Sequence, residues 1–280
     1  MKISLRILIL FIILTLILLQ SCSPREEKTE NTDPVSSDEQ SDTAKTDTAK
    51  TDTLHDSDAV NSSAEETTGY ENGYCVCIDA GHQQKGIPEK EPNGPGSSVL
   101  KAKLSSGTRG VSTGIPEYVL TLEVSLMLKE ELLSRGYKVV MIRETHDCPI
   151  SNAKRAITAN ESGADIFVRI HANGSSDPKV KGALTCAPTF ANEFLSAGII
   201  GESRRLSKII VDSLCASTGA LNRGIYGTDT MTGINWCRIP VTIVEMGYMS
   251  NIEEDELMAT DEYRRKIVDG IANGIDSYFE

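Results

Sequence analysis

Aromatic residues and basic charge are both scarce in this sequence, and their scarcity excludes a broad class of function. Only 5% of the 280 residues are Phe, Trp or Tyr, and 28 Lys and Arg stand against 40 Asp and Glu, which gives a formal net charge of −12. Nucleic-acid binding needs a basic face, and single-strand binding also uses aromatic stacking platforms. We therefore expect no nucleic-acid partner.

Cysteine pairs with CxxC spacing are also absent, so the sequence does not indicate a cysteine zinc site. One of the seven cysteines, Cys22, belongs to a targeting segment. An even number of remaining cysteines in an exported domain permits disulfides. However, their spacing is irregular, and several lie in apolar runs, where a free cysteine acts as a small hydrophobe. No pairing is predicted among Cys75, Cys77, Cys148, Cys186, Cys215 and Cys237.

Residues 1–22 form a predicted targeting segment. Lys2 and Arg6 precede an apolar run over residues 7–19, which is shorter than the roughly 20 residues that span a bilayer. The run ends in Leu19-Gln20-Ser21-Cys22, which resembles a bacterial lipobox. This resemblance implies that Cys22 is lipidated and becomes the mature N-terminus; the alternative is an uncleaved membrane anchor. In both cases we expect an extracytoplasmic protein that is anchored to the cell membrane.

Residues 23–73 contain almost no large apolar side chain and are rich in Asp, Glu, Ser and Thr. The segment Thr43-Ala44-Lys45-Thr46-Asp47 recurs over residues 48–52. Such a composition cannot bury enough apolar surface to offset chain entropy, so we expect a disordered linker. Random-coil scaling gives it a mean reach of about 35–40 Å. The alternative is an acidic binding tail.

The remaining residues, 74–280, alternate between strand and helix patterns. Apolar runs predict strands over residues 74–80, 137–142, 165–171, 182–187 and 240–246. Apolar stripes and capping residues predict helices over residues 116–135, 151–160, 202–218 and, in two pieces, 253–279. This order predicts a single α/β domain, with a mainly parallel, twisted sheet and helices on both faces.

Two histidines and one glutamate lie at or just past the carboxyl ends of predicted strands. They are His82, His171 and Glu245, and ligand sites of α/β sheets gather at that edge. A catalytic zinc takes three protein ligands and leaves one position open. The two histidines are candidate ligands, although each alone fits a structural role. The other histidines, His55 and His146, lie in polar loops.

A carboxylate near the same edge would complete the ligand set. Glu117 opens the helix after the long loop, where the helix dipole also favours an acid. Glu123 and Glu130 lie further along that helix and are worse placed. Glu245 ends an apolar strand, and burial of a lone carboxylate is costly. It suits a general base for a metal-bound water; the alternative is a salt bridge to Arg143, Arg155 or Arg238.

Four motifs, in order, resemble the zinc-dependent N-acetylmuramoyl-L-alanine amidases of the amidase 3 family. They are Asp79-Ala80-Gly81-His82, Glu117 at a helix start, Ile170-His171-Ala172-Asn173, and Glu245-Met246-Gly247-Tyr248-Met249-Ser250-Asn251. The resemblance implies one zinc ion on His82, Glu117 and His171, with Glu245 as the catalytic acid/base. It implies hydrolysis of the bond between muramic acid and L-alanine in peptidoglycan. Asn173 is a further candidate for substrate binding, and we expect a monomer.

Arg169 departs from the family pattern, which usually has a small residue there. Alternation in an extended strand places Arg169 on the same face as His171. We expect it to contact Glu245 or a carboxylate of the stem peptide, and its replacement by serine to reduce activity on peptide-bearing substrate. The alternative is an arginine that only packs between sheet and helix.

Residues 83–115 also depart from the family pattern. This long segment contains Lys85, Lys90, Lys101, Lys103 and Arg109, and it either lines the cleft or covers it as a lid. Two other classes stay open from the residues alone. One is a non-catalytic wall-binding module, and the other is a zinc peptidase that cuts the stem peptide.

Overall fold

The computed structural model describes residues 72–280, which lie in one compact unit. The predicted targeting segment with Cys22, and residues 23–71 of the predicted linker, lie outside the described residues. Within residues 72–280 no helix is long and apolar enough to cross a membrane. All six cysteines of this region are unpaired thiols.

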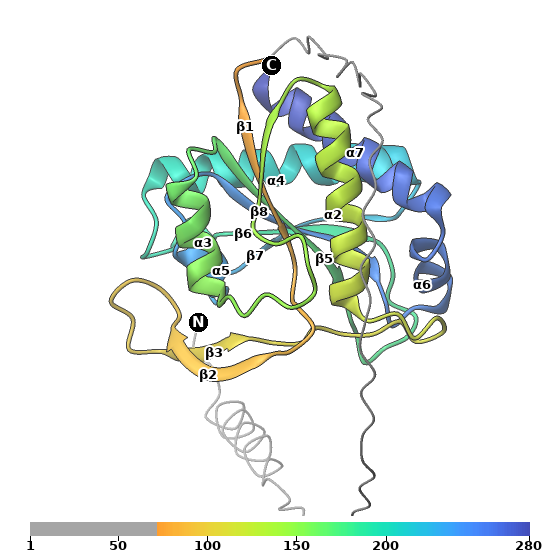
Figure 1. Ribbon diagram of the computed structural model, residues 1–280, viewed down its shortest axis with the longest axis horizontal. Helices are drawn as coiled ribbons and strands as arrows, with labels where there is room; N and C mark the ends of the chain where they lie inside the picture. Colours follow the sequence, from red (N-terminus) through yellow and green to blue (C-terminus); the bar gives the residue numbers. More distant parts are fainter. Residues whose placement is uncertain (1–71) are drawn as a thin grey trace, which may run out of the picture. The chain divides into compact units, whose positions relative to one another are not determined.

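The main sheet is mostly parallel, as the sequence predicts. Its six strands lie in the order β4, β1, β5, β8, β6, β7, and a separate pair is formed by β2 and β3 (Figure 1). Strands β4, β1, β5 and β8 are mutually parallel, whereas β6 runs antiparallel to β8 and carries β7 parallel to itself. The bounds are β1 Cys75–Ala80, β2 Ile87–Pro92, β3 Leu100–Leu104, β4 Lys138–Met141, β5 Ile166–Asn173, β6 Ala183–Ala187, β7 Asn222–Gly227 and β8 Val241–Tyr248.

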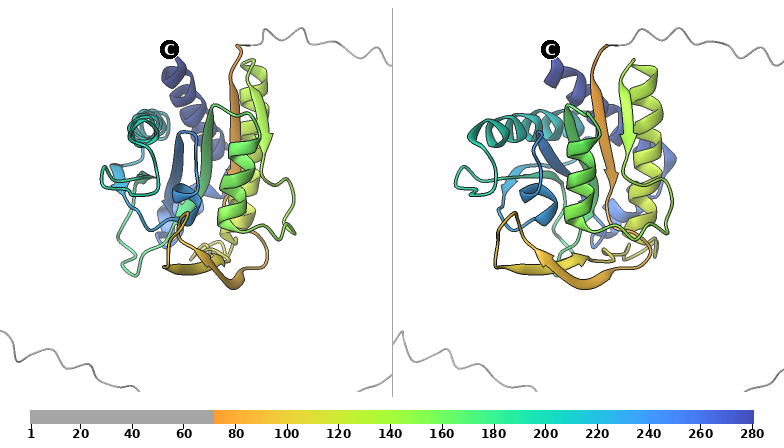
Figure 2. Two further views of the ribbon diagram at one scale, coloured as in Figure 1. Left: turned by 90° about the vertical axis from the view of Figure 1, so that its left-hand side faces the viewer. Right: turned by 60° about the vertical axis from the view of Figure 1, so that its left-hand side comes forward.

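Helices cover both faces of the sheet, but unequally (Figures 1 and 2). The long helices α2, α4 and α7 pack on one face around the larger apolar core, and α3 and the short α5 pack on the other around a smaller core. The thinner cover leaves room above the carboxyl ends of β5 and β8. The helix bounds are α2 Glu117–Ser134, α3 Asn152–Glu161, α4 Ala197–Thr218, α5 Thr232–Asn235, α6 Ile252–Met258 and α7 Asp261–Phe279.

Several helix ends follow their capping residues. The Ser151 side chain accepts a hydrogen bond from the Lys154 amide and begins α3, and Gly219 ends α4 with φ of 75°. The predicted start of α4 at Glu202 is wrong, because Ser196 caps the helix and α4 begins at Ala197. Glycines in that first turn hide the start from a propensity argument.

Four elements were not expected from the sequence. Strands β2 and β3 form within residues 83–115, which were predicted to be loop. The edge strand β7 contains two glycines and has no buried residue, and α5 is a single turn. Short, exposed or proline-containing elements lack the apolar period that marks a strand or helix in sequence.

Candidate functional site

Strand register places the candidate residues in two adjacent rows on the α3/α5 face. In the outer row His171 of β5 pairs with Glu245 of β8. In the inner row Arg169 lies between Asp79 of β1 and Ile243 of β8. Because side chains alternate along a strand, both rows point to the same side of the sheet.

A pocket of about 340 Å³ opens above these rows. Its walls come from β5, β8, the turn before and into α5, the first residue of α3 and the segment after β3. The lining residues are His82, Leu104, Ser105, Gly107, Thr108, Glu117, Asn152, Arg169, His171, Ala172, Asn173, Gly174, Met231, Thr232, Gly233, Ile243 and Glu245.

The end of β1 holds His82 in a rare backbone conformation. His82 has φ of 59°, and among the described residues it is the one non-glycine with positive φ; such strain typically costs about 1–3 kcal/mol and clusters at functional sites. Two buried arginines hold this turn. Arg143 donates to the carbonyls of Ala80 and Gly81 at 2.8 and 2.9 Å, and Arg155 donates to the carbonyl of His82 at 3.0 Å.

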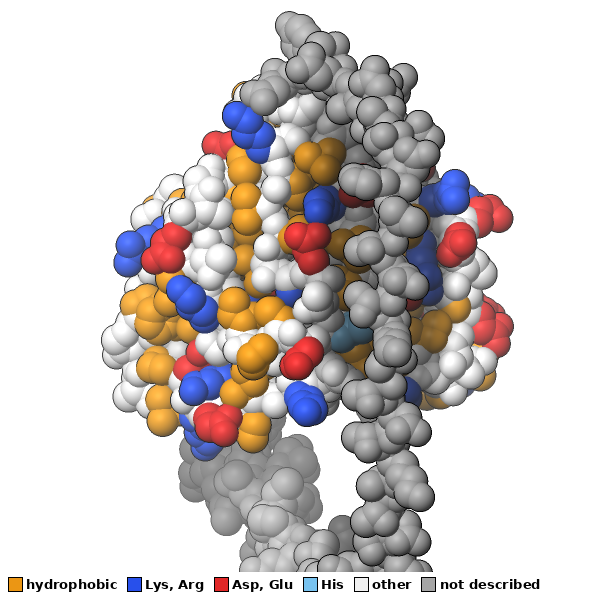
Figure 3. Space-filling view, viewed as in Figure 1, with side chains coloured by type: hydrophobic (Ala, Val, Ile, Leu, Met, Phe, Trp, Pro, Cys, Tyr) orange, Lys and Arg blue, Asp and Glu red, His pale blue; other side chains and the backbone are white. Residues whose placement is uncertain are grey.

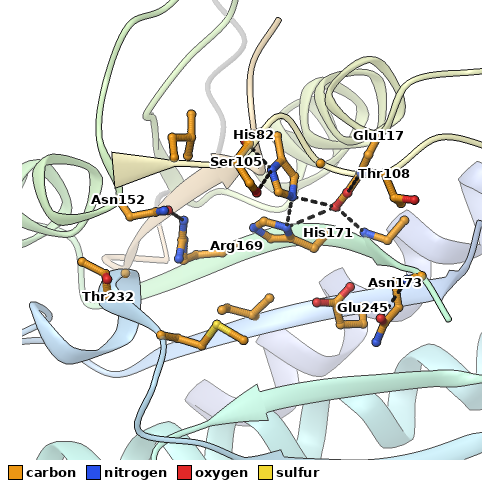
Figure 4. A pocket seen from close by; sticks show the side chains of 17 residues that line it. His82, Ser105, Thr108, Glu117, Asn152, Arg169, His171, Asn173, Thr232 and Glu245 are labelled. Carbon is orange, nitrogen blue, oxygen red and sulfur yellow. Dashed lines mark hydrogen bonds and ion pairs between the residues drawn. The ribbon is translucent and has the colours of Figure 1, made fainter. Parts of the chain in front are cut away.

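Three possible metal-binding side chains converge at the outer row (Figure 4). His82 Nε2 lies 3.1 Å from His171 Nδ1 and 3.1 Å from Glu117 Oε1, and His171 Nδ1 lies 3.2 Å from Glu117 Oε1. With zinc–ligand bonds of about 2.0–2.1 Å, neighbouring ligands of a tetrahedral site are about 3.3 Å apart. The observed triangle therefore fits three corners of a zinc tetrahedron.

Protonation supports the same interpretation. His82 Nδ1 lies 2.9 Å from the carbonyl oxygen of Ser105, which can only accept, so in the tautomer with one ring proton this proton sits on Nδ1 and the Nε2 lone pair is available to a metal. Glu117 accepts from the amides of Thr108 and Ala172. Electron-rich atoms that face one another in a nearly buried site favour a cation between them.

The pKa values of Glu117 and His171 favour the protonation states that bind a cation. Burial alone would raise the pKa of Glu117, but hydrogen bonds from His171 and His82 outweigh it and hold that pKa well below its usual range. Burial lowers the pKa of His171 to about 4, despite its hydrogen bond to Glu117. Glu117 is therefore ionised and His171 is neutral near pH 7, which are the forms that bind zinc. His171 Nε2 has no hydrogen-bond partner among the described residues.

Two glycines make this close packing possible. A Cβ on Gly81 would lie 2.5 Å from the His171 ring, and one on Gly107 would lie 2.7 Å from Glu117 Oε2. Gly107 also has φ of 83°, which favours glycine. Gly81 was part of a motif in the sequence, whereas nothing in the sequence marked Gly107.

Glu245 lies beside this cluster with one oxygen unpaired. Its Oε2 is buried and has no hydrogen-bond partner within the described residues. Burial, followed by repulsion from Glu117, raises the pKa of Glu245 to about 8, although Arg169 opposes this rise. The alternative of a salt bridge from Glu245 to Arg143, Arg155 or Arg238 is wrong: no ion pair to Glu245 occurs in this part of the chain.

Arg169 binds Asp79, and the expected contact with Glu245 is not formed. Its Nε donates to Asp79 Oδ2 at 2.9 Å, and its Nη2 donates to Asn152 Oδ1 at 2.9 Å. Burial alone would raise the pKa of Asp79, but Arg155 and Arg169 lower it to about 2. The strand register explains why Arg169 contacts Asp79 and not Glu245. Arg169 is paired with Asp79 of β1, whereas Glu245 is paired with His171.

The other candidates are placed as follows. Asn173 lines the pocket, and its side-chain oxygen accepts from the Gly174 amide at 2.8 Å. His146 lies outside the pocket and packs edge-on against Tyr118, and His55 lies outside the described residues. No sequence signal marked Asn152, Thr232 or Gly233, because the loops and short helix that carry them have no motif.

The segment over residues 83–115 forms a wall of the pocket. Leu104, Ser105, Gly107 and Thr108 are among the lining residues. The β2–β3 pair is attached to the α5 region, where Trp236 Nε1 donates to the Pro92 carbonyl and Asn235 Nδ2 to that of Asn93, both at 3.0 Å. Figure 3 shows basic, acidic and apolar side chains intermixed over this part of the surface.

Comparison with known proteins agrees with this geometry. The model of the family Amidase_3, described as N-acetylmuramoyl-L-alanine amidase, matches residues 76–277. The chain is 28% identical over 227 residues to the N-acetylmuramoyl-L-alanine amidase Rv3717 of Mycobacterium tuberculosis, covering 78% of this chain and 91% of that protein. It is 29% identical over 171 residues to the uncharacterized protein YqiI of Bacillus subtilis, covering 61% and 78%.

Solved structures show the same fold. The N-acetylmuramyl-L-alanine amidase Ami1 of Mycobacterium smegmatis superposes with a TM-score of 0.67 at 28% identity, over 74% of this chain and 96% of that one. The apo form of Ami1 from Mycobacterium abscessus gives 0.67 at 29% identity, over 74% and 99%.

Proposed function

Because the chain belongs to the Amidase_3 family of N-acetylmuramoyl-L-alanine amidases, we propose that it works with one zinc ion held by His82, Glu117 and His171. The reaction of this enzyme class is hydrolysis of the amide between N-acetylmuramic acid and L-alanine in peptidoglycan. The observation that carries the proposal is the triangle of ligand atoms, with sides of 3.1, 3.1 and 3.2 Å.

A bound zinc would polarise the scissile carbonyl and make water more acidic. Glu245 supplies the proton transfers. Its unpaired Oε2 takes a proton from the attacking water as the carbon–oxygen bond forms, and it then gives a proton to the L-alanine nitrogen as the carbon–nitrogen bond breaks. The products are a lactyl carboxylic acid on the sugar and a peptide with a free amino end. Asn173 lines the same pocket and is proposed to contact the substrate.

Mass analysis of digested peptidoglycan tests this function. An amidase releases sugar strands without peptides, together with peptides that begin with L-alanine. Shortened peptides that stay attached to the sugar would instead indicate a peptidase, and the absence of products with zinc supplied would indicate a binding module. The amidase products should disappear with a chelator and return when zinc is added.

We also propose that the protein acts outside the cytoplasmic membrane as a monomer anchored through lipid on Cys22. The support is the sequence Leu19-Gln20-Ser21-Cys22 after an apolar run. Replacing Cys22 with alanine should abolish incorporation of labelled fatty acid. Retention of the label would contradict lipidation at this residue, and chromatography with light scattering tests the monomer.

A further inference from the structure

Arg169 occupies a defined place relative to the proposed metal ligands. It lies two residues before His171 on the same face of β5, so the two Cα atoms are about 6.6 Å apart along the strand. Both side chains line the same pocket, and Figure 4 shows Arg169 deeper along the sheet beside Asn152 and Thr232. This spacing of two strand residues sets the scale of the separation between a group bound at Arg169 and the reacting carbonyl.

The guanidinium is held rigidly. Asp79 fixes Nε and Asn152 fixes Nη2, each at 2.9 Å, and the side chain is 3% exposed. Gly233 leaves the space that the group needs, since a Cβ there would lie 1.9 Å from Nη1. The guanidinium is thus positioned before any ligand binds, which reduces the conformational entropy lost on binding.

The same guanidinium has an unused hydrogen-bond donor and a positive charge that is only partly compensated. Arginine has five N–H donors, and within residues 72–280 no acceptor is bonded to Nη1. Asp79 is shared with Arg155, which lies 2.5 Å away, so one carboxylate faces two buried guanidinium groups. A buried cation without full compensation favours an anionic ligand.

Substrate chemistry offers one carboxylate at the required distance. In the stem peptide L-alanine is followed by D-glutamate, which is joined through its side-chain carboxyl and keeps its α-carboxylate free or amidated. In an extended chain that carboxylate lies about 7 Å from the scissile carbon. Resting on the proposed amidase function, we propose that Arg169 binds this free α-carboxylate and makes the enzyme selective for stems with D-glutamate over the amidated D-isoglutamine.

Two soluble substrates test the selectivity with the full-length, zinc-loaded protein. They are N-acetylmuramoyl-L-alanyl-D-glutamate and its D-isoglutamine counterpart, both with the side-chain carboxyl blocked as the methylamide, so that they differ only in the α-carboxylate. Wild type should show a kcat/KM about tenfold to a hundredfold higher for the acid, which is the range of a charged hydrogen bond. Arg169→Gln should bring the ratio near one. Arg238→Gln removes an exposed arginine and should keep the wild-type ratio.

The ratio is measured within one sample, so it does not depend on the folded fraction. Asn152→Asp provides a second variant, because a carboxylate beside Nη2 neutralises the site and should also reduce the ratio. Equal kcat/KM values in wild type, or an unchanged ratio in both variants, would overturn the proposal while leaving the amidase function intact. Failure of wild type to cleave either substrate would count against the amidase function itself.

Discussion

Replacing Glu245 with glutamine should stabilise the metal-free protein at alkaline pH and have little effect below pH 5. The carboxyl group is buried beside Glu117, and its pKa rises from 4.5 to about 8. The folded state therefore binds this proton more tightly than the unfolded chain does. The stabilisation from Glu245 is complete below its unfolded pKa and is lost as the pH rises through 8.

The size of the effect follows from this difference in pKa. Each tenfold difference in proton affinity is worth about 1.4 kcal/mol, so the loss approaches about 5 kcal/mol above pH 8. The glutamine of the variant stays neutral and escapes this loss. The free energy of unfolding of the variant minus that of wild type should thus be under about 1 kcal/mol at pH 5, rise up to about pH 8 and then level off. His171, whose pKa is lowered, affects both proteins and cancels in the difference.

Urea unfolding with a chelator present, from pH 5 to pH 9, measures this difference. Glu193→Gln is the matched control, because Glu193 is exposed and its carboxylate makes no hydrogen bond or ion pair within the described residues. Added zinc should reduce the difference in free energy of unfolding between the variant and wild type at alkaline pH, since a nearby cation favours the ionised carboxylate. A difference that stays flat, or that falls as the pH rises, would refute the argument from burial.

Three further outcomes are expected from the same geometry. Gly107→Ala should weaken zinc binding by at least about tenfold in a metal titration, because its Cβ would lie 2.7 Å from Glu117 Oε2; unchanged affinity would contradict the packing. Arg155→Met should lower the free energy of unfolding by about 3–5 kcal/mol, because the buried carbonyls of Ala80 and His82 each lose a donor and Asp79 loses one of its two partners; a loss below about 1 kcal/mol in urea unfolding would contradict this. Zinc at about a thousandfold its Kd should stabilise wild type by about 4 kcal/mol in thermal unfolding, and no shift would argue against a site in the folded state.

The place of the site was predictable because parallel strands bring their carboxyl ends to one edge. That rule brought His82, His171 and Glu245 together from positions far apart in sequence. The first turn of α2 then brought Glu117 to the same edge. Each of these groups lies next to a run of apolar residues that marks a buried strand or helix in the sequence. Its position could therefore be predicted from the hydrophobic pattern alone.

The partner of Arg169 was not predictable, because it depends on register. Alternation gave the correct face, but both Asp79 and Glu245 were acids at the ends of neighbouring strands. Only the pairing of β1 with β5 makes Arg169 level with Asp79. The fold of residues 83–115 was missed for a different reason. Strands β2 and β3 are short, and β2 contains two prolines. Polar contacts with the α5 region, rather than a buried apolar face, fix their position.

The proposed mechanism divides the work between three side chains that hold the metal and a fourth that moves the proton. Zinc content and product formation, measured together in wild type, His171→Ala and Glu245→Gln, test this division. We expect one zinc and cleavage in wild type, neither in His171→Ala, and one zinc without cleavage in Glu245→Gln. Cleavage by zinc-free His171→Ala, or turnover at the wild-type rate in Glu245→Gln, would contradict it.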